Sequence, residues 1–94
     1  MKYVLLGRLD PAWAGKQADR LKKGEAKLKE LGITLESIHY TQGKYDFVDL
    51  VDAPDAEAML SFSVWYAGQG FGRIESLPAF EPKVFEAATK KAAK

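Results

Sequence analysis

The 94-residue sequence contains no cysteine. This absence excludes disulfide bonds, thiol nucleophiles and cysteine-ligated metal centres, and it is typical of the reducing cytoplasm, where we expect the protein to work. His39 is the single histidine, so one chain cannot build a multi-histidine metal site. We therefore expect no metal. We expect no cofactor either, with a haem ligated by His39 as the alternative.

Long apolar runs and a charge excess of either sign are missing as well. No stretch approaches the ~20 apolar residues of a membrane-spanning helix. The apolar run at residues 3–6 is shorter than the ~7–15 residues of a signal peptide, so we expect a strand there. Fourteen basic and 13 acidic residues give a net charge of +1. We expect neither a nucleic acid nor a membrane among the partners, because both favour a strongly basic surface.

The sequence does contain a regular alternation of strand and helix patterns. Runs rich in valine, isoleucine, leucine and aromatic residues predict strands, and apolar residues at spacings of three and four predict helices. Glycine, proline and aspartate mark the boundaries between them. The expected strands cover residues 3–9, 33–41, 45–51 and 71–78, and the expected helices cover residues 14–31, 54–68 and 82–93.

This order predicts an α+β fold with ferredoxin-like β-α-β-β-α-β topology and a C-terminal segment. Right-handed crossovers then place two helices on one face of a four-stranded antiparallel sheet. The length is that of a single domain, residues 1–94. We expect residues 87–94 to form a frayed tail. Gly24 lies inside the first helix at a cost of about 1 kcal/mol relative to alanine, so we expect it to mark a close approach to the sheet.

The face of the sheet opposite the helices is also predicted to be apolar. In the first strand Val4 and Leu6 share one face, while Tyr3 and Leu5 share the other. The third strand has apolar residues on both faces too. A soluble monomer rarely exposes such a patch, and two sheets packed face to face would cover about 800 Å² on each partner. We therefore expect a homodimer through the sheet face.

Three segments resemble a known family. Gly43-Lys44-Tyr45-Asp46 is similar to the Gly-x-Tyr-Asp signature of GYD-domain proteins. The resemblance continues through Val-Asp-Ala-Pro-Asp at 51–55 and Arg-Ile-Glu-Ser-Leu-Pro-Ala-Phe at 73–80, and it spans roughly residues 3–86. It implies a dimeric α/β barrel, in agreement with the strand pattern. It implies little about activity, because the wider superfamily includes cofactor-free monooxygenases, haem-degrading and haem-binding enzymes, isomerases and ligand-sensing domains.

The signature has two interpretations. In the structural one, Gly43 takes a positive φ in the hairpin, Tyr45 packs on the sheet, and Asp46 accepts hydrogen bonds from nearby backbone amides. In the functional one, Tyr45 and Asp46 place a hydroxyl and a carboxylate at the mouth of a cavity. Together with His39, which is otherwise a solvated strand residue, they are the candidate catalytic residues, because all three can move protons.

Charged residues on the predicted strands form a second candidate site. By parity Asp49 shares a face with Tyr45 and Phe47, which we take as the sheet-to-sheet face. Arg73 with Glu75 or Asp49 then forms either an interface ion pair or a polar pocket for an anionic group.

Aromatic residues form a third candidate site. Trp13, Trp65 and Tyr66 either pack in the core or line a pocket for a flat apolar molecule. The candidate ligand-binding residues are together Trp13, Tyr45, Asp49, Trp65, Tyr66 and Arg73.

Three functions remain open from the sequence. The first is a dimeric module that binds a small apolar or anionic molecule, or a partner protein, between the sheet and the helices. The second is a cofactor-independent enzyme of the monooxygenase or isomerase kind, with Tyr45, Asp46 or His39 handling protons. The third is a structural protein that forms higher oligomers through its second helix. The sequence contains no phosphate-binding loop and no nucleophile motif, so it leaves open whether the protein is an enzyme.

Overall fold

The computed structural model describes residues 1–93. Its element order confirms the predicted one, with a short 3₁₀ helix added. The elements are β1 (Lys2–Leu9), η1 (Pro11–Trp13), α1 (Gln17–Glu30), β2 (Thr34–Tyr40), β3 (Phe47–Asp52), α2 (Ala56–Gly68), β4 (Gly72–Ala79) and α3 (Pro82–Ala92).

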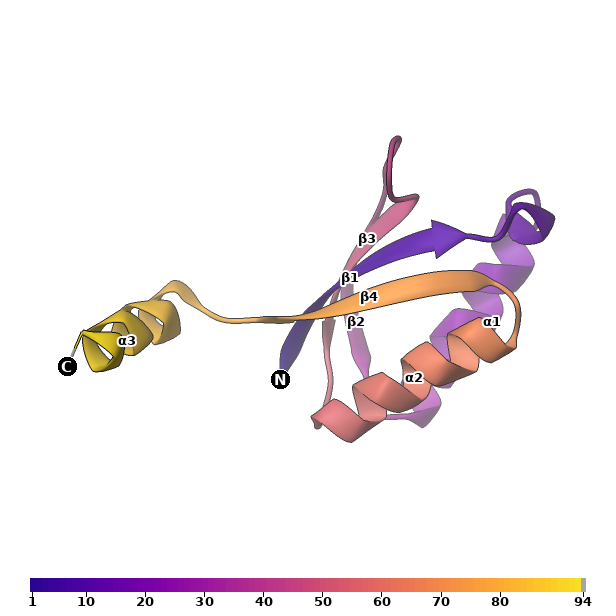
Figure 1. Ribbon diagram of the computed structural model, residues 1–94. Helices are drawn as coiled ribbons and strands as arrows, with labels where there is room; N and C mark the ends of the chain where they lie inside the picture. Colours follow the sequence, from indigo (N-terminus) through magenta and orange to yellow (C-terminus); the bar gives the residue numbers. More distant parts are fainter. Residues whose placement is uncertain (94) are drawn as a thin grey trace.

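The four strands form one antiparallel sheet in the order β2-β3-β1-β4. Both α1 and α2 lie on the same side of this sheet (Figure 1). The fold is therefore the ferredoxin-like α+β arrangement that the sequence predicts. The central strands β1 and β3 pair with Leu5 opposite Asp49, and this register decides which side chains face the helices.

The first helix begins later than expected. The Asp10 carboxylate accepts a hydrogen bond from the Ala12 amide at 2.9 Å, and Pro11 follows it, so the chain forms a 3₁₀ turn before α1. The Lys16 amide closes that turn by donating to the Trp13 carbonyl at 3.0 Å. An aspartate followed by proline is a helix start signal, and here it starts a separate short helix instead of α1.

The core fills the layer between the sheet and the two helices. Its most deeply buried side chains are Leu5, Val51, Met59 and Phe71. A close approach occurs at Gly7 of β1, where a Cβ atom would overlap the ring of Phe47. A Cβ atom on Gly24 would meet nothing within 4 Å. The prediction that Gly24 marks a close approach to the sheet is therefore wrong.

The opposite face of the sheet, called the open face below, is not covered by α1 or α2. Its centre is apolar, as the alternation predicts, with four half-buried side chains and one that is 45% exposed. These are Val4, Leu6, Val48, Leu50 and Leu77. Two ion pairs lie at the end of the sheet where β1 begins. One joins Lys2 to Glu36, and the other joins the N-terminal amine to Asp52. A monomer would leave this apolar area in contact with water.

The last helix, α3, projects away from the rest of the domain beyond the end of β4 (Figure 1). None of its residues is buried, and Phe85 is 69% exposed, while Phe80, which lies between β4 and α3, is 68% exposed. The expected frayed tail, residues 87–94, overlaps α3 as far as Ala92, and Lys94 lies outside the described residues. Within residues 1–93, none of the helices combines the length and the apolar character needed to cross a membrane.

Candidate functional site

The signature turn connects β2 to β3 and fixes the hairpin against β1. Gly43 has a φ of 134°, which favours glycine. The Asp46 amide donates to the Gly7 carbonyl, and the Asp46 carboxylate accepts from the Leu9 amide, both at 2.7 Å. These bonds match the structural interpretation of Asp46, whose carboxylate is engaged by the backbone of β1.

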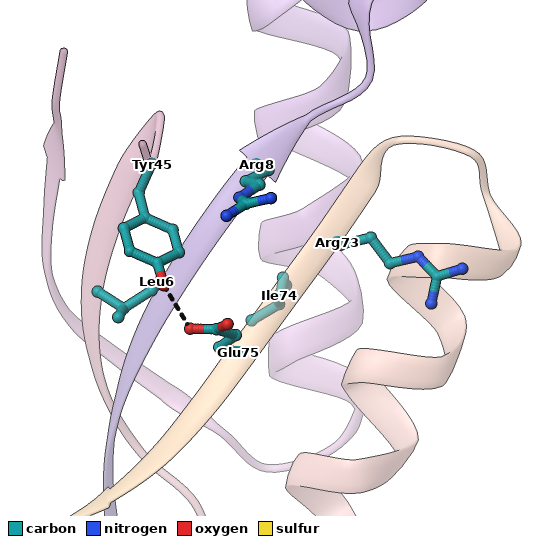
Figure 2. A pocket seen from close by; sticks show the side chains of 6 residues that line it. All are labelled: Leu6, Arg8, Tyr45, Arg73, Ile74 and Glu75. Carbon is teal, nitrogen blue, oxygen red and sulfur yellow. Dashed lines mark hydrogen bonds between the residues drawn. The ribbon is translucent and has the colours of Figure 1, made fainter. Parts of the chain in front are cut away.

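Tyr45 lies differently, because it extends over the open face. Its hydroxyl donates to the Glu75 carboxylate at 2.7 Å, and this bond passes over Leu6 from the hairpin to β4 (Figure 2). Beside it is a hollow of about 230 Å³. The hollow is lined by Leu6, Arg8, Tyr45, Arg73, Ile74 and Glu75.

The hollow is electropositive on one side and carries a tyrosine–carboxylate pair on the other. The Arg8 guanidinium lies 5.4 Å from the centre of the Tyr45 ring, while Arg73 points away from the Tyr45–Glu75 pair (Figure 2). Within residues 1–93 neither arginine forms an ion pair with a carboxylate. The hydrogen bond to Glu75 raises the pKa of Tyr45 above its usual value. Tyr45 is therefore a neutral hydrogen-bond donor at physiological pH.

Asp49 does not join this site, so the prediction that it lies on the sheet-to-sheet face, where it could pair with Arg73, is wrong. It lies on β3 opposite Leu5 and Ile38, on the side of the sheet that the helices cover, and it is only 8% exposed. Asp49 does share a face of β3 with Phe47, as predicted, but that face packs against the helices. Tyr45 precedes β3 and does not follow its alternation, so it reaches the open face while Asp49 does not.

Asp49 instead lies in a buried polar cluster with Arg20 and Tyr66. The Arg20 guanidinium donates to the Tyr66 hydroxyl at 3.2 Å and also to the Gln17 side chain. Burial raises the pKa of Asp49 to about 7, although the nearby Arg20 charge opposes this shift. Burial raises the pKa of Tyr66 as well. Two atoms, Arg20 Nε and Asp49 Oδ1, are buried without a hydrogen-bond partner in the described residues.

Two residues of these sites, Arg8 and Arg20, were not selected from the sequence. The spacing of their neighbours in the sequence nevertheless indicates which face each occupies. Arg8 follows Val4 and Leu6 at intervals of two, so it extends onto the open face. Arg20 precedes Gly24 and Leu28 at intervals of four, and these three are the buried positions of α1. An arginine on the buried stripe of a helix needs polar or charged groups near it, and the nearby groups are the Tyr66 hydroxyl, to which it donates, and the Asp49 carboxylate, whose charge interacts with it.

Trp13, Trp65 and Tyr66 do lie close together, and all three pack around the ring of Phe71. Trp13 and Trp65 pack edge-on against Phe71 with ring centres 4.6 and 5.6 Å away, and Tyr66 packs on it at 5.3 Å. Trp13 also lies beneath the Lys16 ammonium group at 5.1 Å. These aromatic rings pack against one another beside Phe71 in the core, so the structure shows them as core residues and not as the lining of the hollow on the open face.

His39 lies on β2 opposite Val48, exposed on the open face and outside the hollow. Across residues 1–93, no group of three or more histidine, cysteine or acidic side chains is placed to hold a metal ion. A haem ligated by His39 stays a prediction.

The comparisons with known proteins agree with this fold. The GYD domain family matches residues 3–89. The chain belongs to this family. This GYD domain is also similar in structure to 5-chloro-2-hydroxyhydroquinone dehydrochlorinase (TftG) from Burkholderia phenoliruptrix AC1100, solved in complex with 2,5-dihydroxybenzoquinone. The TM-score is 0.60 at 14% identity, covering 88% of this chain and 97% of that one, so the likeness shows a shared fold. No curated protein matches the chain.

Proposed function

We propose that this GYD domain is a cytoplasmic, homodimeric module that binds a small planar anion in the hollow on the open face. The observation that carries the proposal is the convergence of Arg8, Tyr45 and Glu75 on one hollow from three separate segments of the chain. Its volume of about 230 Å³ is just below the usual range of ligand pockets, which begins at about 300 Å³.

Each side chain of the hollow fits one part of such a ligand. The Arg8 guanidinium presents donors that match a carboxylate or a phenolate. The Tyr45 ring offers a flat surface, and Glu75 accepts a hydrogen bond from a ligand hydroxyl. The similar TftG structure contains 2,5-dihydroxybenzoquinone, a small planar molecule. That ligand belongs to TftG, but it supports the choice of probe for this chain.

The homodimer follows from the apolar centre of the open face. Burial of about 800 Å² per partner at about 25 cal/mol per Å² gives a gross gain of tens of kcal/mol, against an association cost of about 4–15 kcal/mol. A second copy placed on Val4, Leu6 and Leu50 would also cover the hollow. Each site would then be enclosed by the partner's sheet.

A second candidate function, a cofactor-independent enzyme, is favoured by the Tyr45–Glu75 hydrogen bond. The pair places a hydroxyl donor and a carboxylate 2.7 Å apart beside the hollow. Because Tyr45 stays protonated at neutral pH, Tyr45 would donate the proton and Glu75 would accept one. Turnover of a bound hydroxyquinone would favour the enzyme, whereas unchanged ligand would favour the binding module.

The test is calorimetric titration of the full chain with 2,5-dihydroxybenzoquinone, whose first ionisation gives a planar anion that keeps one hydroxyl group. We expect saturable binding that Arg8→Met weakens by about 10-fold or more, because a charge-assisted hydrogen bond contributes about 1.5–3 kcal/mol. Lys22→Met removes the same charge from the exposed surface of α1 and is the matched control. Equal affinities of the Arg8→Met variant and the wild type would contradict the site.

A further inference from the structure

We propose a second small-molecule site, independent of the hollow, in the cleft between α1 and the sheet. This α1 cleft takes a neutral aromatic molecule with one hydroxyl group, such as a phenol. It is lined by apolar side chains around a polar floor, including Arg20, Gly24, Leu28, Ile38, Phe47 and Asp49.

The floor of the α1 cleft has an unsatisfied donor and an unsatisfied acceptor. Arg20 is 4% exposed and Asp49 is 8% exposed, so both charged side chains are more than nine-tenths buried. Arg20 Nε is a donor and Asp49 Oδ1 is an acceptor, and both lack a partner within residues 1–93. Buried polar atoms are stable only when they are hydrogen-bonded. A ligand that offers both an acceptor and a donor would satisfy them together.

A hydroxyl group meets both requirements, because its oxygen accepts from Arg20 Nε while its hydrogen is donated to Asp49 Oδ1. The floor carries one positive and one negative side chain. Because groups of opposite sign oppose each other there, a charged ligand gains no strong net attraction, whereas taking its charge out of water costs free energy. The chemistry of the floor therefore selects a neutral ligand.

The walls suit an aromatic ring. Leu28, Ile38 and Phe47 are apolar, and Gly24 contributes no side chain, with nothing within 4 Å of where its Cβ would be. The cavity volume of the cleft is about 30 Å³, much less than that of the hollow and enough for one small polar group. The floor holds a group of the size of a hydroxyl, and the ring would lie at the mouth beside Gly24.

The α1 cleft is separate from the hollow of the proposed function. Asp49 and Phe47 face the helices, whereas Tyr45 and Glu75 lie on the open face of the same sheet. The two sites share no lining residue. A failure of one proposal therefore leaves the other standing.

The test is an NMR titration of the full-length protein with phenol and, as the matched probe without a hydroxyl, toluene. We expect saturable amide shifts at Gly24, Leu35 and Ile38 with phenol, and at least 10-fold weaker binding of toluene. Gly24→Leu should abolish phenol binding by filling the mouth. Ala26→Leu adds the same side chain on an exposed position of α1 and should leave binding unchanged. Tyr45→Phe should also leave it unchanged.

Gly24→Ala is the second variant, in case the Gly24→Leu protein does not fold. It adds one methyl group at the same point and should weaken phenol binding several-fold. Equal affinity for phenol and toluene would overturn the role of Arg20 and Asp49. Shifts confined to the open face, or unchanged phenol affinity in the Gly24 variants, would overturn the location.

Discussion

Two glycines of this chain have opposite environments. Gly24 lies in a helix interior with empty space where a Cβ would be, whereas Gly7 lies directly beneath the Phe47 ring. Alanine has a helix propensity about 1 kcal/mol better than that of glycine. Gly24→Ala should therefore raise the free energy of unfolding by about 1 kcal/mol. Gly7→Ala should lower it by about 1–3 kcal/mol through overpacking.

Urea denaturation of the two variants measures both changes. Gly15→Ala is a suitable control, because Gly15 precedes α1 and a Cβ there also meets nothing within 4 Å. A Gly7→Ala protein as stable as the wild type would show that Phe47 can move aside.

Asp49 makes stability depend on pH. Its pKa is about 7 in the folded protein and 3.8 in the unfolded chain. The folded state therefore binds more protons than the unfolded state between these values, and stability falls as the pH rises from about 4 to about 7. The loss is up to about 4 kcal/mol, because one pKa unit corresponds to about 1.4 kcal/mol.

Denaturation curves at a series of pH values test this dependence. Asp49→Asn keeps the shape of the side chain and cannot ionise, so it should flatten the curve between pH 4 and 7. The same slope in the Asp49→Asn variant would assign the pH dependence to other groups.

At the scale of elements, the order of strands and helices could be predicted, because the alternation of apolar residues depends on local geometry. The start of α1 could not, because the capping of η1 by Asp10 competes with helix propensity. The sequence also could not predict which face of β3 packs against the helices. Alternation tells which residues share a face, but both faces are apolar here. The register opposite the buried Leu5 and the burial of Asp49 show that it faces the helices.

Only part of the candidate site could be predicted from the sequence. Tyr45 and Arg73 were among the expected ligand-binding residues, and both line the hollow. Arg8 was not, because its place depends on the register of β1 with β4, which brings Arg8 opposite Arg73. The register of two strands depends on pairing between residues far apart in the chain, and a single sequence does not specify that pairing.

The hairpin carries adjacent residues with different roles, and this can be tested. Asp46 ties the turn to β1 through the Leu9 amide, whereas Tyr45 reaches over the open face. Asp46→Ala should lower the free energy of unfolding by about 1–3 kcal/mol, because the Leu9 amide loses its partner. Tyr45→Phe should change stability by less than about 0.5 kcal/mol but weaken binding of 2,5-dihydroxybenzoquinone. The opposite pattern in calorimetry and denaturation would reverse these roles.

At the scale of the whole molecule, the open face should hold two copies together. Leu50→Glu places a charge in the apolar centre of that face and should convert the dimer to a monomer. Leu60→Glu places the same charge on α2, where Leu60 is already 64% exposed, and should leave the dimer intact. Native mass spectrometry distinguishes the two. Dissociation by Leu60→Glu alone would instead favour assembly through the second helix.

The projecting helix α3 has a consequence for how the protein meets proteases. Its 11 residues have no buried side chain, and an isolated helix shorter than about 12–15 residues is marginal in water. Local unfolding there costs little and breaks none of the sheet pairing. Trypsin should therefore cut first at Lys83, Lys90 or Lys91, releasing short peptides while the sheet, α1 and α2 stay folded.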